Sequence, residues 1–101
     1  MLYCLICIDR ENSIETRMLN REAHLNYVGE TNVVKFAGPF LSEEDTMIGS
    51  LIVIDVDSKE AAESWSKNDP YKKADLFQKQ ILLIITPRFL KLKFRIQKNS
   101  N

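Results

Sequence analysis

The single histidine, His24, is the residue of this chain best suited to move protons near neutral pH. Histidine side chains ordinarily titrate at about pH 6.5, which makes them acids or bases under physiological conditions. His24 falls within a predicted helix, at a position from which its ring can face a cavity beside a sheet. A lone helical histidine is more often a half-exposed or hydrogen-bonded structural residue, so the residue type by itself leaves both interpretations open.

Asp69 has two candidate roles. It directly precedes Pro70 at the start of a predicted helical turn, which is a favourable N-cap position. If His24 lies close by, the same carboxylate can accept a hydrogen bond from the imidazole and leave the other ring nitrogen free to act as acid or base. A carboxylate has two oxygens, and we expect each role to use a different one.

Two arginines accompany the histidine on the same predicted helix. At about 100° per residue, Arg21 falls almost within the apolar stripe, and Arg17 and His24 lie on its shoulder. A charged residue in a core stripe is typical of functional sites, where it can attract the negative charge of a ligand. A long arginine can equally lay its stem on apolar surface and direct its guanidinium to solvent. The stripe itself consists of Ile14, Met18 and Leu25.

Four further residues are candidate ligand contacts. Tyr71 offers a phenol that can hydrogen-bond a ligand or close one end of the fold. Ser50 begins a predicted strand and can contribute a hydroxyl to the same pocket. Gly38 and Pro39 end the neighbouring strand, where a residue without a side chain allows backbone groups to approach a ligand closely.

Cys4 and Cys7 form a Cys-x-x-Cys pattern, which occurs in redox motifs and zinc sites. A redox motif places its first cysteine at a helix N-terminus, whereas both cysteines here fall in a predicted strand and point to opposite faces. We therefore expect two reduced, partly buried thiols.

One histidine and scattered carboxylates predict no metal site. Without a glycine-rich phosphate loop or a dinucleotide fingerprint, the remaining expectation is acid/base chemistry with no cofactor.

The elements that must position these residues follow from hydrophobic periodicity. Residues 2–8 are apolar on both faces, as expected of a central strand. A helix is predicted to start at Asn12, which can form a capping box with Glu15, and to run to about Gly29. The rest of the chain predicts strands at residues 33–40 and 48–56, a helix that starts at Asp57 or Ser58 and stops at Asn68, a helical turn at 69–77 and a strand at 79–86.

The order β-α-β-β-α-β predicts a ferredoxin-like α+β fold, in which an antiparallel sheet carries both helices on one face. With 101 residues, 45% of them hydrophobic and 28% charged, the chain has the size and composition of one globular domain. The apolar run of residues 1–8 is too short for a signal sequence or a membrane span, which predicts a cytoplasmic protein. The second sheet face needs a cover, and we expect a homodimer packed sheet against sheet.

Five short segments occur in a specific order and spacing: Met1-Leu2-Tyr3, residues 17–25 (RMLNREAHL), Ala37-Gly38-Pro39, Gly49-Ser50-Leu51, and Asp69-Pro70-Tyr71 with Ala74 and Leu76-Phe77. Together they resemble the YciI-like (YCII-related) family. The resemblance implies a ferredoxin-like, dimeric α/β barrel with a pocket in each subunit, lined by a histidine and an aspartate that correspond to His24 and Asp69. Family members with a proposed activity act on small ring compounds, for example by eliminating halide from a chlorinated hydroxyquinol.

The resemblance ends near Pro87, so we expect a domain at residues 1–87 and a divergent basic strand or tail at 88–101. Residues 87–101 hold five of the 14 basic residues and no acid, whereas residues 1–86 hold all 14 acids. Apolar and basic residues alternate over 90–96, as in an edge strand whose lysines discourage aggregation. Five scattered charges beside an acidic body predict neither nucleic acid nor a membrane as a partner.

Two functions from different classes fit these observations. The first is a small enzyme of lyase or isomerase type, in which His24 moves a proton on a small cyclic or enolisable organic acid and Asp69 orients the ring. In this enzyme, Arg17 or Arg21 attracts the negative charge of the substrate. The second is a non-catalytic ligand-binding or regulatory module, because ferredoxin-like dimers also serve as sensors and docking domains. Turnover, as opposed to binding alone, distinguishes the two.

Overall fold

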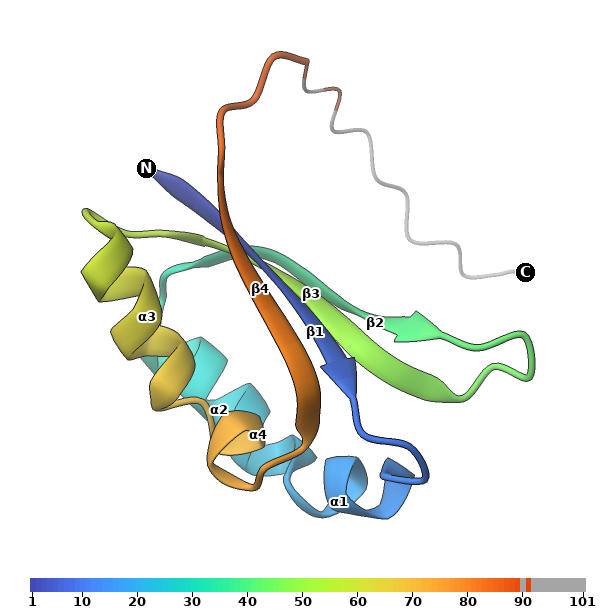
Figure 1. The fold of residues 1–101 in the computed structure, drawn as a ribbon. Helices are drawn as coiled ribbons and strands as arrows, with labels where there is room; N and C mark the ends of the chain where they lie inside the picture. The colour runs from blue at the N-terminus through green and yellow to red at the C-terminus, as the bar shows by residue number, and fades with distance from the viewer. Residues whose placement is uncertain (90, 92–101) are drawn as a thin grey trace, which may run out of the picture.

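The computed structural model of the chain describes residues 1–89 and residue 91. One antiparallel sheet contains the four strands in the order β2-β3-β1-β4 (Figure 1). Of the basic tail predicted at 88–101, residue 90 and residues 92–101 lie outside the described part of the chain. The strands are β1 (Leu2–Asp9), β2 (Val34–Leu41), β3 (Met47–Asp55) and β4 (Phe77–Ile85).

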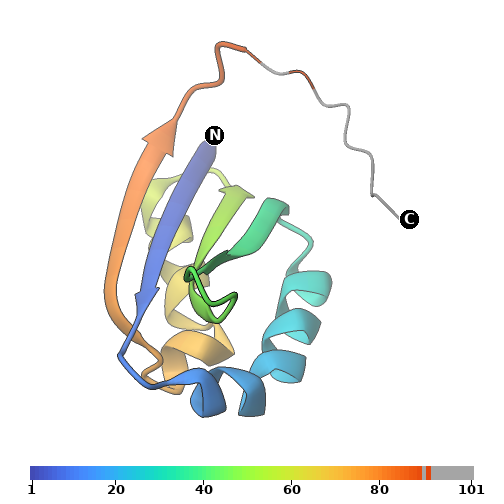
Figure 2. The ribbon, with the colours of Figure 1, turned by 90° about the vertical axis from the view of Figure 1, so that its right-hand side faces the viewer.

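The core lies between the sheet and the helices. β1 is a central strand, and its Leu5 lies opposite Ile52 of β3 and Leu82 of β4. Side chains of a strand alternate between the two faces, so the inward positions of β1 form a buried row that includes Tyr3, Leu5 and Cys7. Figures 1 and 2 show the helices on this face of the sheet and no helix on the other. This arrangement is the predicted ferredoxin-like α+β fold.

The first helical segment consists of two helices instead of the single helix that periodicity predicted. α1 spans Ile14–Leu19 and α2 spans Arg21–Thr31, with Asn20 between them. The Asn20 side chain donates from Nδ2 to the carbonyl oxygen of Thr16 at 2.8 Å, and its own carbonyl accepts from the backbone N–H of His24 at 3.0 Å. Asparagine bonds of this kind compete with a continuous helical backbone, so Asn20 ends one helix and begins the next.

The predicted capping box at the start of α1 was wrong. Ser13, not Asn12, is the N-cap residue of α1, and it makes no side-chain capping bond among the described residues. Asn12 has a φ of 57°, in the left-handed region that asparagine adopts more easily than most residues. An N-cap residue has a negative φ, so Asn12 turns the chain after β1 and does not cap α1.

The caps of the later helices are the predicted ones. α3 spans Lys59–Lys67, and the hydroxyl of Ser58 accepts a hydrogen bond from the backbone N–H of Ala61 at 3.1 Å. α4 spans Pro70–Lys73, and Asp69 is its N-cap. Both capping residues have an extended backbone, as N-cap geometry requires.

The apolar stripe predicted for the first helical segment does not face the core. Ile14, Met18 and Leu25 are 37%, 52% and 47% exposed, whereas Arg17 and His24 are only 3% and 7% exposed. Ile14, Met18 and Arg17 all lie in α1, before the break between the two helices, so the orientation of α1 itself places Arg17 inward and the two apolar residues outward. Arg17 and His24 can be buried because each contacts a buried carboxylate, as described below.

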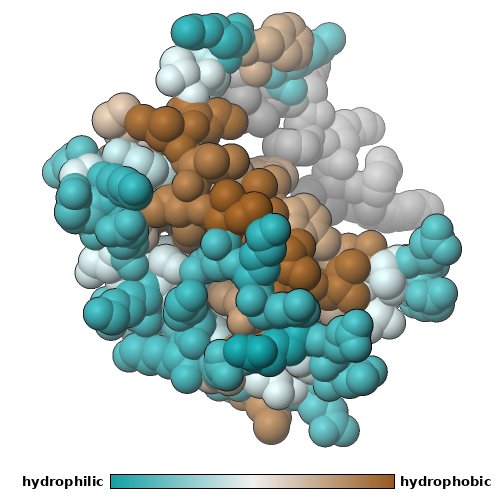
Figure 3. Space-filling model, viewed as in Figure 1, coloured by the Kyte–Doolittle hydropathy of each residue, from teal (hydrophilic) through white to brown (hydrophobic). Residues whose placement is uncertain are grey.

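The face of the sheet without helices is apolar. Figure 3 shows its apolar side chains as a brown band over the strands. On β1, β3 and β4, the apolar residues that alternate with the buried rows are Leu2, Cys4, Ile6, Ile8, Leu51, Val53, Ile81, Leu83 and Ile85, all of them only partly buried or exposed. The charged residues Asp55 and Lys79 lie toward the ends of the same rows. Among the described residues, no helix is long and apolar enough to cross a membrane.

Substitution by alanine should change the free energy of unfolding in opposite directions at two glycines, Gly49 and Gly29. A Cβ at Gly49 on β3 would clash with the backbone carbonyl oxygen of Cys7 on the paired strand, and neither strand can yield without breaking the sheet. We expect Gly49→Ala to lower the free energy of unfolding by about 1–3 kcal/mol. Gly29→Ala is the matched control, because nothing lies within 4 Å of its Cβ in α2.

In Gly29→Ala, the better helix former should raise the free energy of unfolding by about 0.5–1 kcal/mol. Urea unfolding followed by circular dichroism measures both variants. Equal stability of the two proteins would show that the close approach of β3 to β1 at Gly49 is not required.

Candidate functional site

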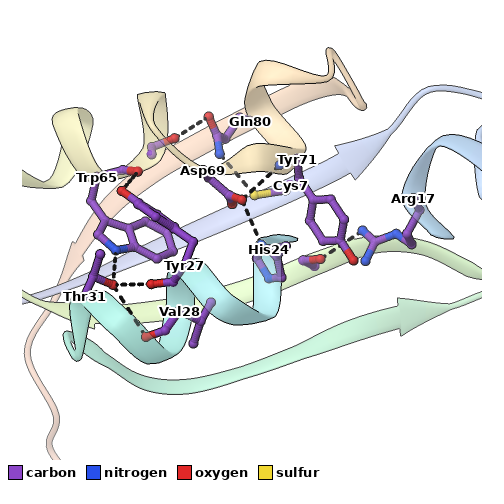
Figure 4. A network of polar contacts seen from close by, with 12 residues as sticks. Cys7, Arg17, His24, Tyr27, Val28, Thr31, Trp65, Asp69, Tyr71 and Gln80 are labelled. Atoms are coloured by element: carbon purple, nitrogen blue, oxygen red, sulfur yellow. Dashed lines mark hydrogen bonds and ion pairs between the residues drawn. The ribbon is translucent and has the colours of Figure 1, made fainter. Parts of the chain in front are cut away.

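His24 and Asp69 form a buried pair between α2 and the start of α4. Nδ1 of His24 lies 2.8 Å from Oδ1 of Asp69, and the two side chains are 9% and 1% exposed. Figure 4 shows the imidazole directed toward the carboxylate across the gap between the two helices. The two residues are 45 positions apart in the sequence, with β2, β3 and α3 between them, so only the folded chain brings the pair together.

One oxygen of Asp69 performs both of the roles considered from the sequence. Oδ1 accepts the hydrogen bond from the backbone N–H of Tyr71 at 3.0 Å, which caps α4, and it also contacts Nδ1 of His24. The expectation of a separate oxygen for each role was therefore wrong. A carboxylate oxygen has two lone pairs, so both bonds can be made at once. The cap and the histidine contact are in this way one structural feature.

Tyr71 lies between His24 and Arg17. Its ring stacks on the imidazole with a centroid separation of 4.0 Å and an interplanar angle of 14°. On the same tyrosine ring, the guanidinium carbon of Arg17 lies 4.7 Å from the centroid, a cation–π distance. Burial raises the pKa of the Tyr71 phenol, although the positive charges of Arg17 and Arg21 act in the opposite direction.

Arg17 is buried and makes three hydrogen bonds to protein groups. Its Nε and Nη2 donate to the two carboxylate oxygens of Asp9 at 2.8 and 3.0 Å, and Nη2 also donates to the hydroxyl of Ser50 at 2.9 Å. Burial lowers the pKa of Arg17, but the hydrogen bond and charge of Asp9 outweigh it, so the net pKa is raised. Arg17 therefore keeps its charge, and that charge is already balanced within the protein.

Asp9 is a residue of this site that the sequence reasoning missed. It occupies the inward position of β1 that follows Tyr3, Leu5 and Cys7, and it is 8% exposed. The signal was present in the sequence, because an acid that continues a row of core residues requires a buried partner. The partner is Arg17, eight residues later, on the helix that follows the strand.

A cavity of about 160 Å³ brings the sequence-predicted residues together. Seven of the eight line it: Arg17, Arg21, His24, Gly38, Pro39, Ser50 and Tyr71. Asp69 does not line it, but it contacts two residues that do, the His24 ring and the backbone of Tyr71. The remaining lining residues were not predicted, and they make one part of the wall apolar: Leu25, Ala37, Met47 and Ile52.

The two cysteines lie on opposite faces of β1, as predicted. Both are free thiols; Cys7 is buried and Cys4 is partly buried. Burial raises the pKa of Cys7 to about 11, so its thiol is protonated near neutral pH. Gln80 donates a hydrogen bond from Nε2 to its sulfur at 3.2 Å. Within residues 1–89 and 91, no group of three His, Cys, Asp or Glu side chains is arranged to hold a metal ion.

The sequence pattern of the YCII-related domain matches residues 1–85. The chain belongs to the YCII-related family. Two curated relatives, both called Protein YciI, come from Escherichia coli O6:H1 and Shigella flexneri. Each is 29% identical to this chain over 87 residues, which cover 77% of this chain and 89% of the relative.

Solved structures of other proteins share the fold of this chain. The 5-chloro-2-hydroxyhydroquinone dehydrochlorinase of Burkholderia phenoliruptrix, in complex with 2,5-dihydroxybenzoquinone, is 29% identical and superposes with a TM-score of 0.78 over 85% of this chain and 94% of that chain. A candidate antibiotic biosynthesis monooxygenase of Bacteroides thetaiotaomicron, 17% identical with a TM-score of 0.58 over 94% and 95% of the two chains, shares the fold alone. The YCII-related chain thus has a ferredoxin-like fold of the dimeric α/β-barrel type, one that is used by small-molecule enzymes.

Removing Arg17 should destabilise the protein strongly, because it leaves the Asp9 carboxylate buried without a cation. We expect Arg17→Met to lower the free energy of unfolding by about 3–5 kcal/mol, the usual cost of breaking a buried pair on one side. The control is Arg10→Met, which breaks the exposed pair between Arg10 and Asp75 and should cost less than about 1 kcal/mol. Urea unfolding measures both, and equal losses would contradict the buried pairing of Arg17.

Proposed function

We propose that this YCII-related protein is a small-molecule enzyme of lyase or isomerase type that works by acid/base chemistry without a cofactor. The observation that carries the proposal is the buried contact between His24 and Asp69 at the wall of the cavity. A carboxylate that accepts from Nδ1 favours the tautomer with the proton on that nitrogen. Nε2 is then the nitrogen with a free lone pair, and it acts as the base.

The two arginines have different parts in this proposal. Arg17 is paired with Asp9 and Ser50, so it has no free charge to offer a substrate. Arg21 is exposed, lines the same cavity, and makes no ion pair with any described residue. We therefore assign the attraction of an anionic substrate to Arg21. Arg17 lines the cavity next to the Tyr71 ring and contributes a polar group to its wall.

The size of the cavity favours a substrate with one small ring. An apolar cavity of about 150 Å³ is large enough to bind benzene, and the cavity here measures about 160 Å³. Its wall has a polar part, with Arg21, His24 and Ser50, and an apolar part. A ring with an acidic hydroxyl or carboxyl group and an apolar edge matches both. The similar dehydrochlorinase acts on a compound of that description, which supports the proposal.

The proposed reaction is a proton transfer at such a ring or at an enolisable acid. Nε2 of His24 takes a proton from the substrate, and the electron pair of the broken bond enters the ring. In a lyase that acts on a chlorinated hydroxyquinol, the ring reacts as its keto tautomer, in which the carbon that carries chlorine is sp3. The electron pair of the broken O–H bond forms a C=O bond, the ring double bond shifts, and the C–Cl bond breaks to release chloride. In an isomerase the imidazolium returns the proton to another atom. Asp69 stabilises the imidazolium between the two steps, because its carboxylate lies against Nδ1.

His24→Gln tests the proposed base. The wild-type protein is screened with chlorinated hydroxyquinols, beginning with 5-chloro-2-hydroxyhydroquinone, and chloride release is measured. Loss of a general base costs about 10²- to 10⁴-fold in kcat, and we expect a loss of that size in a folded variant. Glu22→Gln, an exposed change on the same helix, is the control and should retain wild-type kcat.

Two results would contradict the enzyme proposal. One is a folded His24→Gln protein with wild-type turnover. The other is a wild-type protein that binds 2,5-dihydroxybenzoquinone in calorimetry but turns over none of the screened compounds; this result would favour the ligand-binding module.

We also propose that two copies pack through the sheet face that carries no helix. That face presents apolar side chains from at least three strands, including Leu51, Val53 and Leu83, and apolar patches of such extent are rare on monomers. A second copy matches the face because a two-fold axis sets equal apolar surfaces against each other. The dimeric α/β-barrel type of the fold is consistent with this packing.

The mass in solution tests the dimer. Light scattering should give twice the 11.7 kDa of the chain for the wild type, and a lower average mass for Val53→Glu, which places a charge in the middle of the face. Glu43→Gln, in the exposed turn between β2 and β3, should leave the mass unchanged. A monomeric wild type at micromolar concentration would contradict the proposed packing.

A further inference from the structure

Asp9 is buried in the functional part of the molecule but does not line the cavity. Its two carboxylate oxygens accept from Nε and Nη2 of Arg17 at 2.8 and 3.0 Å, which is a two-point contact between a carboxylate and a planar guanidinium. Two such bonds determine both the position and the tilt of the guanidinium plane. A single contact would leave that plane free to rotate.

Ser50 adds a third point of attachment. Its hydroxyl accepts from Nη2 of Arg17 at 2.9 Å, and it belongs to β3, whereas Asp9 ends β1. β1 and β3 are hydrogen-bonded neighbours in the sheet. The guanidinium is therefore attached to the rigid sheet at two strands, although Arg17 itself belongs to the short helix α1.

The guanidinium in turn limits the position of the Tyr71 ring. Its central carbon lies 4.7 Å from the tyrosine centroid, and the imidazole of His24 lies 4.0 Å from that centroid. Figure 4 shows Tyr71 between the two side chains, with Arg17 beyond the end of the ring that points away from α4. The backbone of Tyr71 is held separately, by its bond to Asp69.

His24 is held by two contacts of different kinds. Its Nδ1 contact with Asp69 sets the distance of the ring but leaves its plane free to pivot about that contact. The nearly parallel stack on Tyr71 sets the plane. Because the stack depends on the tyrosine position, the direction in which Nε2 points into the cavity depends on Arg17, and Arg17 depends on Asp9.

We propose that Asp9 is a positioning residue for His24, acting through Arg17 and Tyr71. Stability alone is a weak reason for this pair, since buried ion pairs can often be replaced by apolar residues without loss of stability. Specification of geometry is a better-supported use of such a pair, and the stacked rings are the geometry to be specified here. The consequence for catalysis rests on the proposed function, whereas the consequence for the ring position does not.

The first test measures the ring position by NMR. Protons of His24, the only imidazole in the chain, are shifted by the ring current of the stacked tyrosine, and Tyr71→Leu provides the reference without a stack. In Asp9→Asn we expect the His24 ring resonances to move toward that reference. The control is Asp75→Asn, which removes the carboxylate of the exposed Arg10 pair and should leave the resonances at their wild-type positions.

A double variant separates positioning from stability. Asp9→Asn leaves Arg17 charged and unpaired, so it also destabilises the protein, whereas Asp9→Asn with Arg17→Gln leaves no buried charge at this place and should recover stability. Because glutamine replaces Arg17, the double variant has no guanidinium next to the Tyr71 ring. We therefore expect its His24 resonances to remain displaced although its stability returns, and this variant keeps the proposal testable if Asp9→Asn alone does not fold.

Two results would overturn the proposal. One is a folded Asp9→Asn protein whose His24 resonances equal those of the wild type. The other is a double variant in which the resonances return together with stability, since this is the behaviour of a purely structural pair. Neither result depends on a substrate, so the proposal can fail or succeed whether or not turnover is found.

Where turnover is found, kinetics supply a second readout. A misplaced base lowers kcat, and a displacement of about 1 Å costs up to about 100-fold. Asp9 does not line the cavity, so KM should stay within about twofold of the wild type in a folded Asp9→Asn protein. The double variant does not serve for this comparison, because Arg17 lines the cavity. A rise in KM at unchanged kcat would contradict positioning and indicate a role in substrate binding.

Discussion

The arrangement of the candidate site depends on one buried carboxylate, that of Asp69. A carboxylate that is 1% exposed is costly to bury unless its oxygens are hydrogen-bonded. Oδ1 meets this requirement with the backbone of Tyr71 and the ring of His24. The same atom therefore starts α4, sets the place of the tyrosine that follows, and ties α4 to the imidazole on α2. This one oxygen therefore makes both the contact that caps a helix and the contact with the imidazole.

The two arginines of the site illustrate how burial decides the use of a charge. Arg17 is turned toward the sheet, where Asp9 balances its charge and Ser50 takes a further hydrogen bond. Arg21, four residues later, lies at the exposed edge of the cavity. The charge of Arg17 is balanced by Asp9, whereas Arg21 makes no ion pair with a described residue, and we propose that it attracts an anionic ligand. Both are useful in a cavity that is proposed to hold an anionic ring.

The sheet links the site to the proposed assembly. β1 and β3 present Cys7 and Ser50 toward the helices and the cavity, and Cys4 and Val53 toward the opposite face. The alternation of side chains along a strand makes a single sheet serve both surfaces. This YCII-related chain thus uses one face of its sheet for a core and a small cavity, and its other face is apolar, where we propose that a second copy packs.

The sequence by itself determined the order of strands and helices, the central place of β1, and the caps at Ser58 and Asp69, because these depend on periodicity and on contacts between near neighbours. It also indicated most of the residues that line the cavity, through their types and through the family resemblance. It did not predict the helix break at Asn20 or the partner of Arg17. The break reflects a side-chain bond that competes with the backbone. The apolar stripe pointed to the wrong face because Arg17, which pairs with Asp9, is buried in place of Ile14 and Met18 on the same helix.

Only the tertiary structure decided which groups meet. The contact between His24 and Asp69 joins residues 45 positions apart, and the choice of Arg17 for burial and Arg21 for exposure depends on where α1 lies against the end of β1. Periodicity assigns a residue to a face of one element, but the partner across the interface depends on how the elements pack. A charged side chain is buried only where packing supplies a partner, because the free-energy cost of burying an unpaired charge favours exposure to solvent.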